Sequence, residues 1–229
     1  MYIDINNNLH RTRKIDDSVS GTTAASAWVE GDIVKVANIG DSRVIVGRRI
    51  DSEGETKDGE RAKYKAIALS NDQTPYRKDE RDRIKKTGAR VLTYDMLEGN
   101  TPIHENWDIE LGVGLDEGGD PPRVWSPTGK YPGNAFTRSI GDKLSESLGV
   151  YAEPELTTHQ MVKEDEYIVV ASDGIWEFMT NQQCLDLITS SPTLEMACSK
   201  IVAEAYMLWI TNETRTDDIT AIICQKIKV

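Results

Sequence analysis

The chain has 229 residues and a formal net charge of −11, from 27 lysines and arginines against 38 aspartates and glutamates. This acidic balance argues against partners such as nucleic acids and anionic membrane surfaces, which favour basic patches. No apolar run reaches the roughly 20 residues that cross a bilayer, and we expect neither a membrane span nor a secretory signal. The 3 cysteines are widely spaced without a CxxC pair, which predicts reduced thiols and a cytoplasmic or nuclear protein.

The first part of the chain is predicted to be mostly β structure. Strands are expected over residues 21–30, 33–39 and 43–46, joined by Gly-Asp turns into an antiparallel meander. A further strand is expected over residues 64–69. The charged segment 77–87, followed by a glycine, predicts a surface helix.

An irregular segment follows, at about residues 97–133, rich in Gly, Pro, Asp and Glu. We expect it to form a flap beside the functional site that contributes to substrate choice, because long loops in compact domains are usually functional. A short strand and a helix are then expected within residues 135–148.

The last part of the chain contains the clearest elements. The apolar run 167–171 predicts a buried strand, and Thr180 with Gln183 predicts a capping box at the start of a helix. A longer helix should follow Pro192, and a final strand is expected over residues 219–227. Strands and helices that are segregated in this way predict a single α+β domain, a layered sandwich, over residues 1–229.

Acidic residues follow several of the predicted strands. Asp173 comes directly after the buried strand 167–171, Asp217 precedes the last strand, and Asp72 follows residues 64–69. Each one alone also fits a strand-ending turn, an edge-protecting charge or an Asx turn. Together they could converge on one edge of the sandwich, as an oxygen-ligand metal site requires.

A series of motifs favours the metal-site interpretation over the turns. In chain order they are Ser20-Gly21-Thr22-Thr23-Ala24, Ala37-Asn38-Ile39-Gly40-Asp41-Ser42-Arg43, Leu69-Ser70-Asn71-Asp72-Gln73-Thr74-Pro75, Gly88-Ala89-Arg90-Val91, Thr137-Arg138-Ser139-Ile140-Gly141-Asp142, Ala171-Ser172-Asp173-Gly174-Ile175-Trp176 and Asp217-Asp218-Ile219-Thr220. This series resembles the type 2C, or PPM, metal-dependent protein serine/threonine phosphatases.

The resemblance implies a fold and a set of metal ligands. The fold would be a four-layer α/β/β/α sandwich with two antiparallel sheets, incomplete at the N-terminal side. Asp173 and Asp217 would bind the catalytic metal centre, which holds two to three Mg²⁺ or Mn²⁺ ions in the family. Asp72 and Glu177 would match the positions of a weaker third metal, with Glu177 standing where the family usually has Asp.

Other residues in these motifs receive structural interpretations. Arg138 and Asp142 are expected to hold the junction between the irregular segment and the core, and Asp41 is expected to form a hairpin turn. The implied reaction is hydrolysis of phosphoserine or phosphothreonine in phosphoproteins by a metal-activated water. None of the cysteines has the CxxxxxR spacing of cysteine phosphatases, which agrees with a reaction that needs no covalent intermediate.

Residues 118–123 and 131–142 resemble one subgroup, the phosphatase domains of plant and protist proteins fused to cyclic-nucleotide-binding and kinase domains. The family's Asp-Gly-His-Gly motif, which supplies a bridging ligand and a general acid, does not occur in the sequence. We therefore expect an incomplete phosphatase domain that lacks its opening segment. The alternatives are a pseudophosphatase that acts as a binding module and an unrelated acidic Ca²⁺-binding module.

Overall fold

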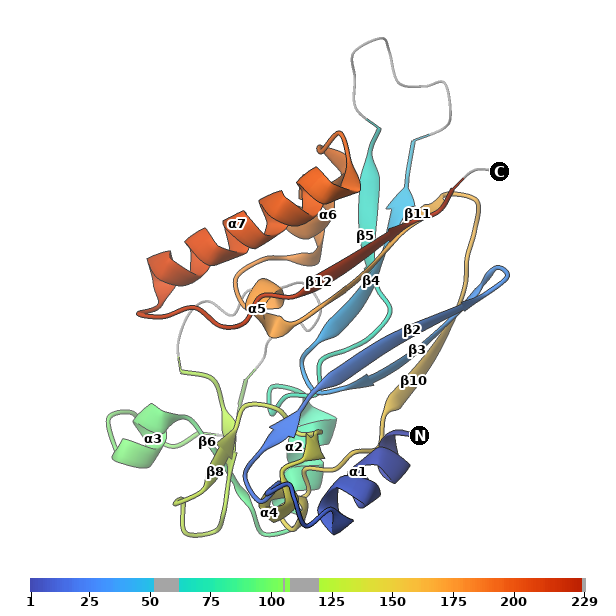
Figure 1. Cartoon of the computed structure of the whole chain (residues 1–229). Coiled ribbons are helices and arrows are strands. Elements are labelled where there is room, and N and C mark those ends of the chain that lie inside the picture. The colour runs from blue at the N-terminus through green and yellow to red at the C-terminus, as the bar shows by residue number, and fades with distance from the viewer. Residues whose placement is uncertain (52–61, 105, 108–119, 228–229) are drawn as a thin grey trace.

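The computed structural model describes residues 1–51, 62–104, 106–107 and 120–227. Two antiparallel sheets stack on each other (Figure 1). The first has the strand order β10-β3-β2, with β10 Glu155–Gln160, β3 Ile33–Ile39 and β2 Ala24–Glu30. The second has the order β12-β11-β4-β5, with β12 Ala221–Gln225, β11 Asp165–Ala171, β4 Arg43–Arg49 and β5 Tyr64–Ala68. These sheets confirm the predicted α+β sandwich.

Helices cover both outer faces. α6 (Asn181–Thr189) and α7 (Leu194–Asn212) pack on the second sheet around buried Leu185 and Ile201. On the first sheet, the Tyr2 hydroxyl at the start of α1 (Tyr2–Arg11) lies 2.6 Å from Ser26 Oγ. Trp28 and Leu156 on the same face are 69% and 77% exposed, so α1 covers one end of the sheet.

A smaller sheet lies below the sandwich in Figure 1. It has the order β6-β7-β8, with β6 Arg90–Leu92, β7 Arg123–Trp125 and β8 Pro132–Asn134. The helices α2 (Lys78–Lys85) and α3 (Tyr94–Glu98) pack beside it through the buried Ile84 and Met96. Segment 97–133 therefore contains strands that the sequence did not predict; residues 105 and 108–119 of this segment lie outside the described part of the chain.

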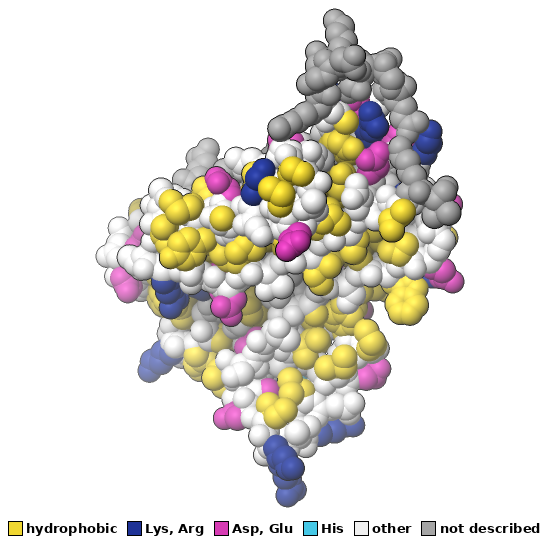
Figure 2. Space-filling view, turned by 45° about the horizontal axis from the view of Figure 1, so that its top comes forward, with side chains coloured by type: hydrophobic (Ala, Val, Ile, Leu, Met, Phe, Trp, Pro, Cys, Tyr) yellow, Lys and Arg dark blue, Asp and Glu magenta, His cyan; other side chains and the backbone are white. Residues whose placement is uncertain are grey.

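The remaining described elements are short. β1 (Gly21–Thr22) pairs with β9 (Ile140–Gly141), α4 (Lys143–Glu146) follows β9, and α5 (Asp173–Trp176) follows β11. Helix α7 is apolar on its outer side as well as its inner side, with Val202, Tyr206 and Met207 exposed on the surface (Figure 2). None of the helices within the described residues is long and apolar enough to cross a membrane.

The predicted meander of residues 21–46 is wrong in one respect. β2 and β3 pair as expected, but β4 belongs to the second sheet and pairs with β5 and β11. Val34 and Val36 of β3 pack face to face with Val44 and Val46 of β4 in the core between the sheets. The same alternation of valines suits two paired strands or two stacked ones, so the pattern could not separate them. Gly40, with a φ of 87°, allows the chain to cross between the sheets.

Asp165 joins three strands at the far end of the sandwich. Its fully buried carboxylate accepts hydrogen bonds from Arg48 Nε at 2.6 Å, from the Val162 N–H at 3.0 Å and from His159 Nε2 at 2.8 Å. Burial opposes ionisation, but these hydrogen bonds and the charge of Arg48 outweigh it and lower the pKa of Asp165. The ionised carboxylate therefore stabilises the folded state.

We expect Asp165→Asn to lower the free energy of unfolding at pH 7 by about 2–3 kcal/mol, the range for hydrogen bonds to a buried charge. Because the folded pKa lies below the ordinary 3.8, this stabilisation is present above that value and is lost as the pH falls through the folded pKa. Urea unfolding between pH 7 and pH 3 measures both effects, with exposed Asp4→Asn as the control. A difference from wild type that stays constant down to pH 3 would contradict the assignment.

Candidate metal centre

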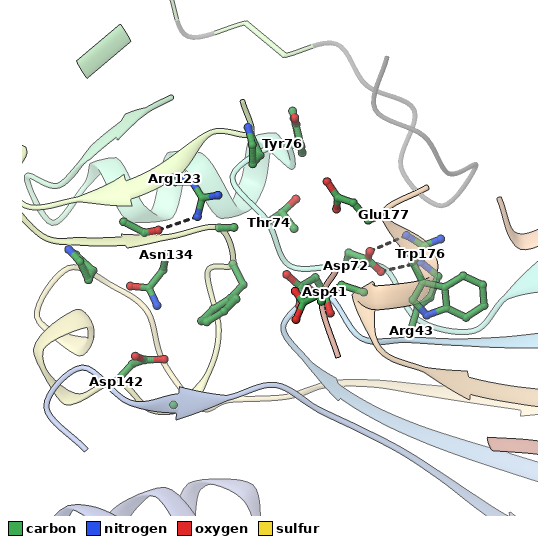
Figure 3. A pocket seen from close by; sticks show the side chains of 18 of the residues that line it. Asp41, Arg43, Asp72, Thr74, Tyr76, Arg123, Asn134, Asp142, Trp176 and Glu177 are labelled. Atoms are coloured by element: carbon green, nitrogen blue, oxygen red, sulfur yellow. Dashed lines mark hydrogen bonds and ion pairs between the residues drawn. The ribbon is translucent and has the colours of Figure 1, made fainter. Parts of the chain in front are cut away.

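A cavity of about 700 Å³ opens between the edge of the sandwich and the small sheet (Figure 3). Acidic side chains from separate parts of the chain line its sandwich side. They are Asp41, Asp72, Asp173, Glu177 and Asp217. All the metal ligands predicted from the sequence thus border one cavity.

The register of the second sheet explains why these residues meet. Ala171 at the end of β11 pairs with Arg43 at the start of β4 and with Ala221 at the start of β12. Because the strands are antiparallel, residues after β11 and residues before β4 and β12 lie at the same edge. This edge carries Asp173, Asp41 and Asp217. Asp72 and Glu177 reach the cavity from the segments after β5 and α5.

The electrostatics of the site show uncompensated negative charge. Burial, followed by the charges of Asp173, Asp72 and Glu177, raises the pKa of Asp41 well above its ordinary value. Burial and the charge of Asp217 raise the pKa of Asp173 to about 6. Crowded carboxylates of this kind disfavour one another's ionised forms, and a divalent cation among them would remove that penalty.

The donor set fits a hard cation. Carboxylate oxygens are the ligands that Mg²⁺ and Mn²⁺ prefer, and Mg²⁺ is commonly held by one or two carboxylates with water completing its shell. Within the described residues, the one group of three acidic side chains with oxygens within 4.8 Å of one another lies elsewhere, at Asp79, Glu80 and Glu155. We therefore expect each ion in the cavity to contact a pair of carboxylates and several waters.

The group at Asp79, Glu80 and Glu155 has cationic partners of its own. Arg77 Nη2 lies 2.6 Å from Asp79 and 2.7 Å from Glu155, and Arg138 Nη2 lies 2.7 Å from Glu80. Arginine already neutralises these carboxylates, so the group forms an ion-pair network.

Asp72 has a strong partner within the protein. Arg43 Nε donates to Asp72 Oδ1 at 2.9 Å and Arg43 Nη2 donates to Oδ2 at 2.6 Å, which is a bidentate ion pair (Figure 3). Both carboxylate oxygens are therefore engaged by the guanidinium. The role of Asp72 as a third-metal ligand stays a prediction, and its position shows a second role in holding Arg43.

Asp41 is the site residue that the sequence interpretation placed wrongly. It does not lie in a hairpin turn, because β3 and β4 belong to different sheets. Its carboxyl instead lies near those of Asp173, Asp72 and Glu177, whose charges raise its pKa. The available signal was its position: like Asp173, it directly follows a strand with buried residues and leads into the next element.

Arg138 and Asp142 have the structural contacts expected of them. Arg138 forms an ion pair with Glu80 and donates to the Glu153 carbonyl at 2.9 Å. Asp142, with a φ of 48°, accepts a hydrogen bond from the Ser139 hydroxyl at 2.6 Å. Asp142 also borders the cavity, so it ties one wall of the site to the core.

The 3 histidines all lie within the described residues, and none borders the cavity. His10 contacts Asp17 and Glu146, and His159 contacts Asp165. His104 lies against Trp107, with ring centroids 5.0 Å apart. The described cavity wall thus offers no imidazole that could act as a general acid.

Comparisons with known proteins agree with the site. The family model described as "Protein phosphatase 2C" matches residues 2–213. The chain belongs to the protein phosphatase 2C family. "Probable protein phosphatase 2C 35" of Arabidopsis thaliana is 45% identical over 225 residues, and "Probable protein phosphatase 2C 61" of the same plant is 33% identical over 223 residues. These matches cover 98% and 96% of the chain but 60% and 59% of the relatives, so the chain spans about three-fifths of their length.

Solved structures confirm the phosphatase 2C fold. The serine-threonine phosphatase 2C from Toxoplasma gondii superposes with a TM-score of 0.69 at 19% identity, over 98% of this chain and 64% of that one. A C. elegans sex determining protein superposes with a TM-score of 0.60 at 16% identity, over 97% of this chain and 50% of that one. At these identities the likeness concerns the fold alone.

We expect Asp173→Asn to have opposite effects with and without metal. In EDTA the variant should melt roughly 2–4 °C above wild type, the shift for about 1 kcal/mol, because one charge leaves the repelling group. Mn²⁺ or Mg²⁺ should raise the melting temperature of wild type and leave the variant nearly unchanged. Thermal unfolding with and without metal measures this, with exposed Asp4→Asn as the control. The same metal-induced rise in both proteins would exclude Asp173 as a ligand.

Proposed function

We propose that the phosphatase 2C domain to which this chain belongs hydrolyses phosphoserine and phosphothreonine in proteins. The observation that supports this most is the convergence of Asp41, Asp173 and Asp217 on one cavity, with the pKa values of Asp41 and Asp173 raised. A bound Mg²⁺ or Mn²⁺ would neutralise the phosphate and supply a water of lowered pKa as the nucleophile.

The residues of this chain divide into ligands and supports. Asp173 and Asp217 are proposed to hold the catalytic metal centre. Asp72 and Glu177 are proposed to hold a further, weaker ion. Asp41 is an added candidate ligand, because its carboxyl interacts with the charges of Asp173, Asp72 and Glu177. Arg43 contributes by fixing Asp72, and the Trp176 ring lies 5.2 Å from its guanidinium carbon.

We also propose that segment 97–133 contributes to substrate choice, and the position of its described residues supports this. Pro121, Arg123, Pro132 and Gly133 border the cavity on the side opposite the carboxylates. A substrate bound at the carboxylates would therefore face these residues. The proposed substrates are phosphoproteins, and the proposed location is the cytoplasm or the nucleus.

The likeness to phosphatases fused with cyclic-nucleotide-binding and kinase domains also stays a proposal. Its support is the sequence of residues 118–123 and 131–142. The second of these segments contains Asn134 and Asp142, which border the cavity, so the subgroup resemblance concerns part of the site wall.

One observation favours a second candidate function, a pseudophosphatase that binds phosphoproteins. The described cavity wall contains no histidine, and the sequence contains no Asp-Gly-His motif. A site that binds metal and phosphate without a general acid would retain the ligand and lose most of the rate. Membership of the phosphatase 2C family argues against the third alternative, an unrelated Ca²⁺-binding module.

We expect the 229-residue chain alone to hydrolyse a phosphothreonine peptide slowly or not at all with Mn²⁺ or Mg²⁺. A general acid contributes about 10²–10⁴-fold, and the described cavity wall provides no histidine for this role. Joining an upstream segment that carries the family's Asp-Gly-His-Gly motif should raise the rate at least about 100-fold. Asp173→Asn in the extended protein should then abolish the EDTA-sensitive activity.

Phosphate release by these proteins, with and without EDTA, distinguishes the candidates. Robust EDTA-sensitive turnover by the 229-residue chain would contradict the account of the general acid. An inactive extended protein that still binds the phosphopeptide would favour the pseudophosphatase.

A further inference from the structure

An arginine lies across the cavity from the carboxylates (Figure 3). Arg123 is the first residue of β7 and borders the cavity from the small sheet. Its Nη1 donates to the Gly133 carbonyl at 3.1 Å, and its guanidinium carbon lies 5.0 Å from the centre of the Tyr94 ring. These two contacts fix the plane of the guanidinium, and its one carboxylate neighbour among the described residues, Asp120, forms only a long ion pair with it.

Arg123 also has an unused hydrogen-bond donor. Its Nε is buried and has no hydrogen-bond partner among the residues that the structure describes. The Asp120 carboxylate is 3.9 Å from Nε, which is too far for a hydrogen bond, and its Oδ2 already accepts from the Asp95 N–H at 3.0 Å. A buried donor without a partner is costly, so this guanidinium is not fully satisfied by the protein. The side chain is 26% exposed, and within the described residues its Nη2 donates no hydrogen bond, which leaves a donor for a ligand in the cavity.

Two other arginines near the site, Arg43 and Arg138, have a partner for every guanidinium nitrogen. Arg43 donates from all its guanidinium nitrogens, to Asp72 and Asn181. Arg138 donates from all of its nitrogens as well, to Glu80, Glu155 and the Glu153 carbonyl. Arg215 borders the cavity as well, but no hydrogen bond, ion pair or ring contact orients it among the described residues. Arg123 is oriented and has donor capacity left over.

The carboxylates that could hold cations and Arg123 lie on different walls of the cavity. Asp41, Asp173 and Asp217 border one wall, where bound cations would draw the substrate's phosphate. A group beside the phosphorylated residue then faces the opposite wall, which carries Arg123. A planar guanidinium held edge-on to a cavity suits a carboxylate, which it can bind through two parallel hydrogen bonds.

We propose that Arg123 binds the carboxylate of an acidic residue adjacent to the phosphoserine or phosphothreonine, so that the site prefers acid-flanked phosphopeptides. This inference rests on the proposed function. It assigns to the small sheet a specific chemical preference, since a peptide with neutral flanks offers the Arg123 guanidinium no charged acceptor.

Binding of fluorescein-labelled phosphothreonine peptides tests the proposal by anisotropy in the presence of Mn²⁺. One peptide carries glutamates on both sides of the phosphothreonine, and its matched partner carries glutamines. Wild type should bind the glutamate peptide about tenfold more tightly, a difference equivalent to one charge-assisted pair. Arg123→Gln should reduce this preference to within about twofold, and Arg123→Lys should retain part of it.

Lys130→Gln is the matched control, because it removes one exposed positive charge from the turn between β7 and β8 without touching the cavity. Its preference should equal that of wild type, and thermal unfolding checks that each variant folds. If Arg123→Gln unfolds, Arg123→Lys alone decides, because it keeps the charge and loses the two-bond geometry.

Three results would overturn the proposal. They are equal binding of the two peptides by wild type, full retention of the preference by the Arg123 variants, and equal loss of both peptides by these variants, which would place the phosphate itself on Arg123. A non-phosphorylated glutamate peptide separates this inference from the proposed function. If it binds as well as the phosphopeptide, phosphate recognition fails, whereas the glutamate–glutamine comparison still reports on Arg123.

Discussion

The ion pair between Arg43 and Asp72 holds together the segments that build the site. Arg43 begins β4, Asp72 follows β5, and Arg43 Nη1 also donates to Asn181 at the start of α6 at 2.7 Å. The guanidinium lies against Trp176 of α5, the helix that begins with Asp173. One buried arginine thus fixes two strands and two helices at the same edge. This cation also offsets part of the repulsion among the carboxylates gathered there.

The site therefore stores an unfavourable interaction that the rest of the fold must outweigh. Asp41 and Asp173 are placed by backbone at strand ends, so they cannot move apart to relieve their repulsion. The sandwich supplies the opposing free energy through the valines packed between the sheets and the apolar faces of α6 and α7. Natural proteins commonly accept such local destabilisation where binding requires it. A bound cation converts the same arrangement from a penalty into a source of stability.

The features that could be predicted from the sequence are those set by residues close together in the chain. The capping box at Thr180 formed as expected, and the buried strand before Asp173 is β11, because both signals act within a few residues. Sheet membership depends on contacts distant in sequence, so the crossover between β3 and β4 was missed, and with it the position of Asp41. The strands of the small sheet are 3 residues each, too short for periodicity to show. The ion pair between Asp72 and Arg43 likewise could not be predicted from the motif around either residue.

The contacts of the Glu80 carboxylate restrict how the cavity wall can move. Glu80 is 2% exposed, and its carboxylate receives hydrogen bonds from Arg83 and Thr137 and an ion pair from Arg138. Separating residues 137–138 from α2 would remove Thr137 and Arg138 from this buried carboxylate and leave it only Arg83 of the same helix, and breaking a buried ion pair in this way is strongly destabilising. The wall and α2 must consequently open as one cooperative unit, and the amide protons of both should exchange with solvent at a common, slow rate. The side of the cavity that carries Asn134 and Asp142 is thus held firmly against α2, and a substrate would meet it as a preformed surface.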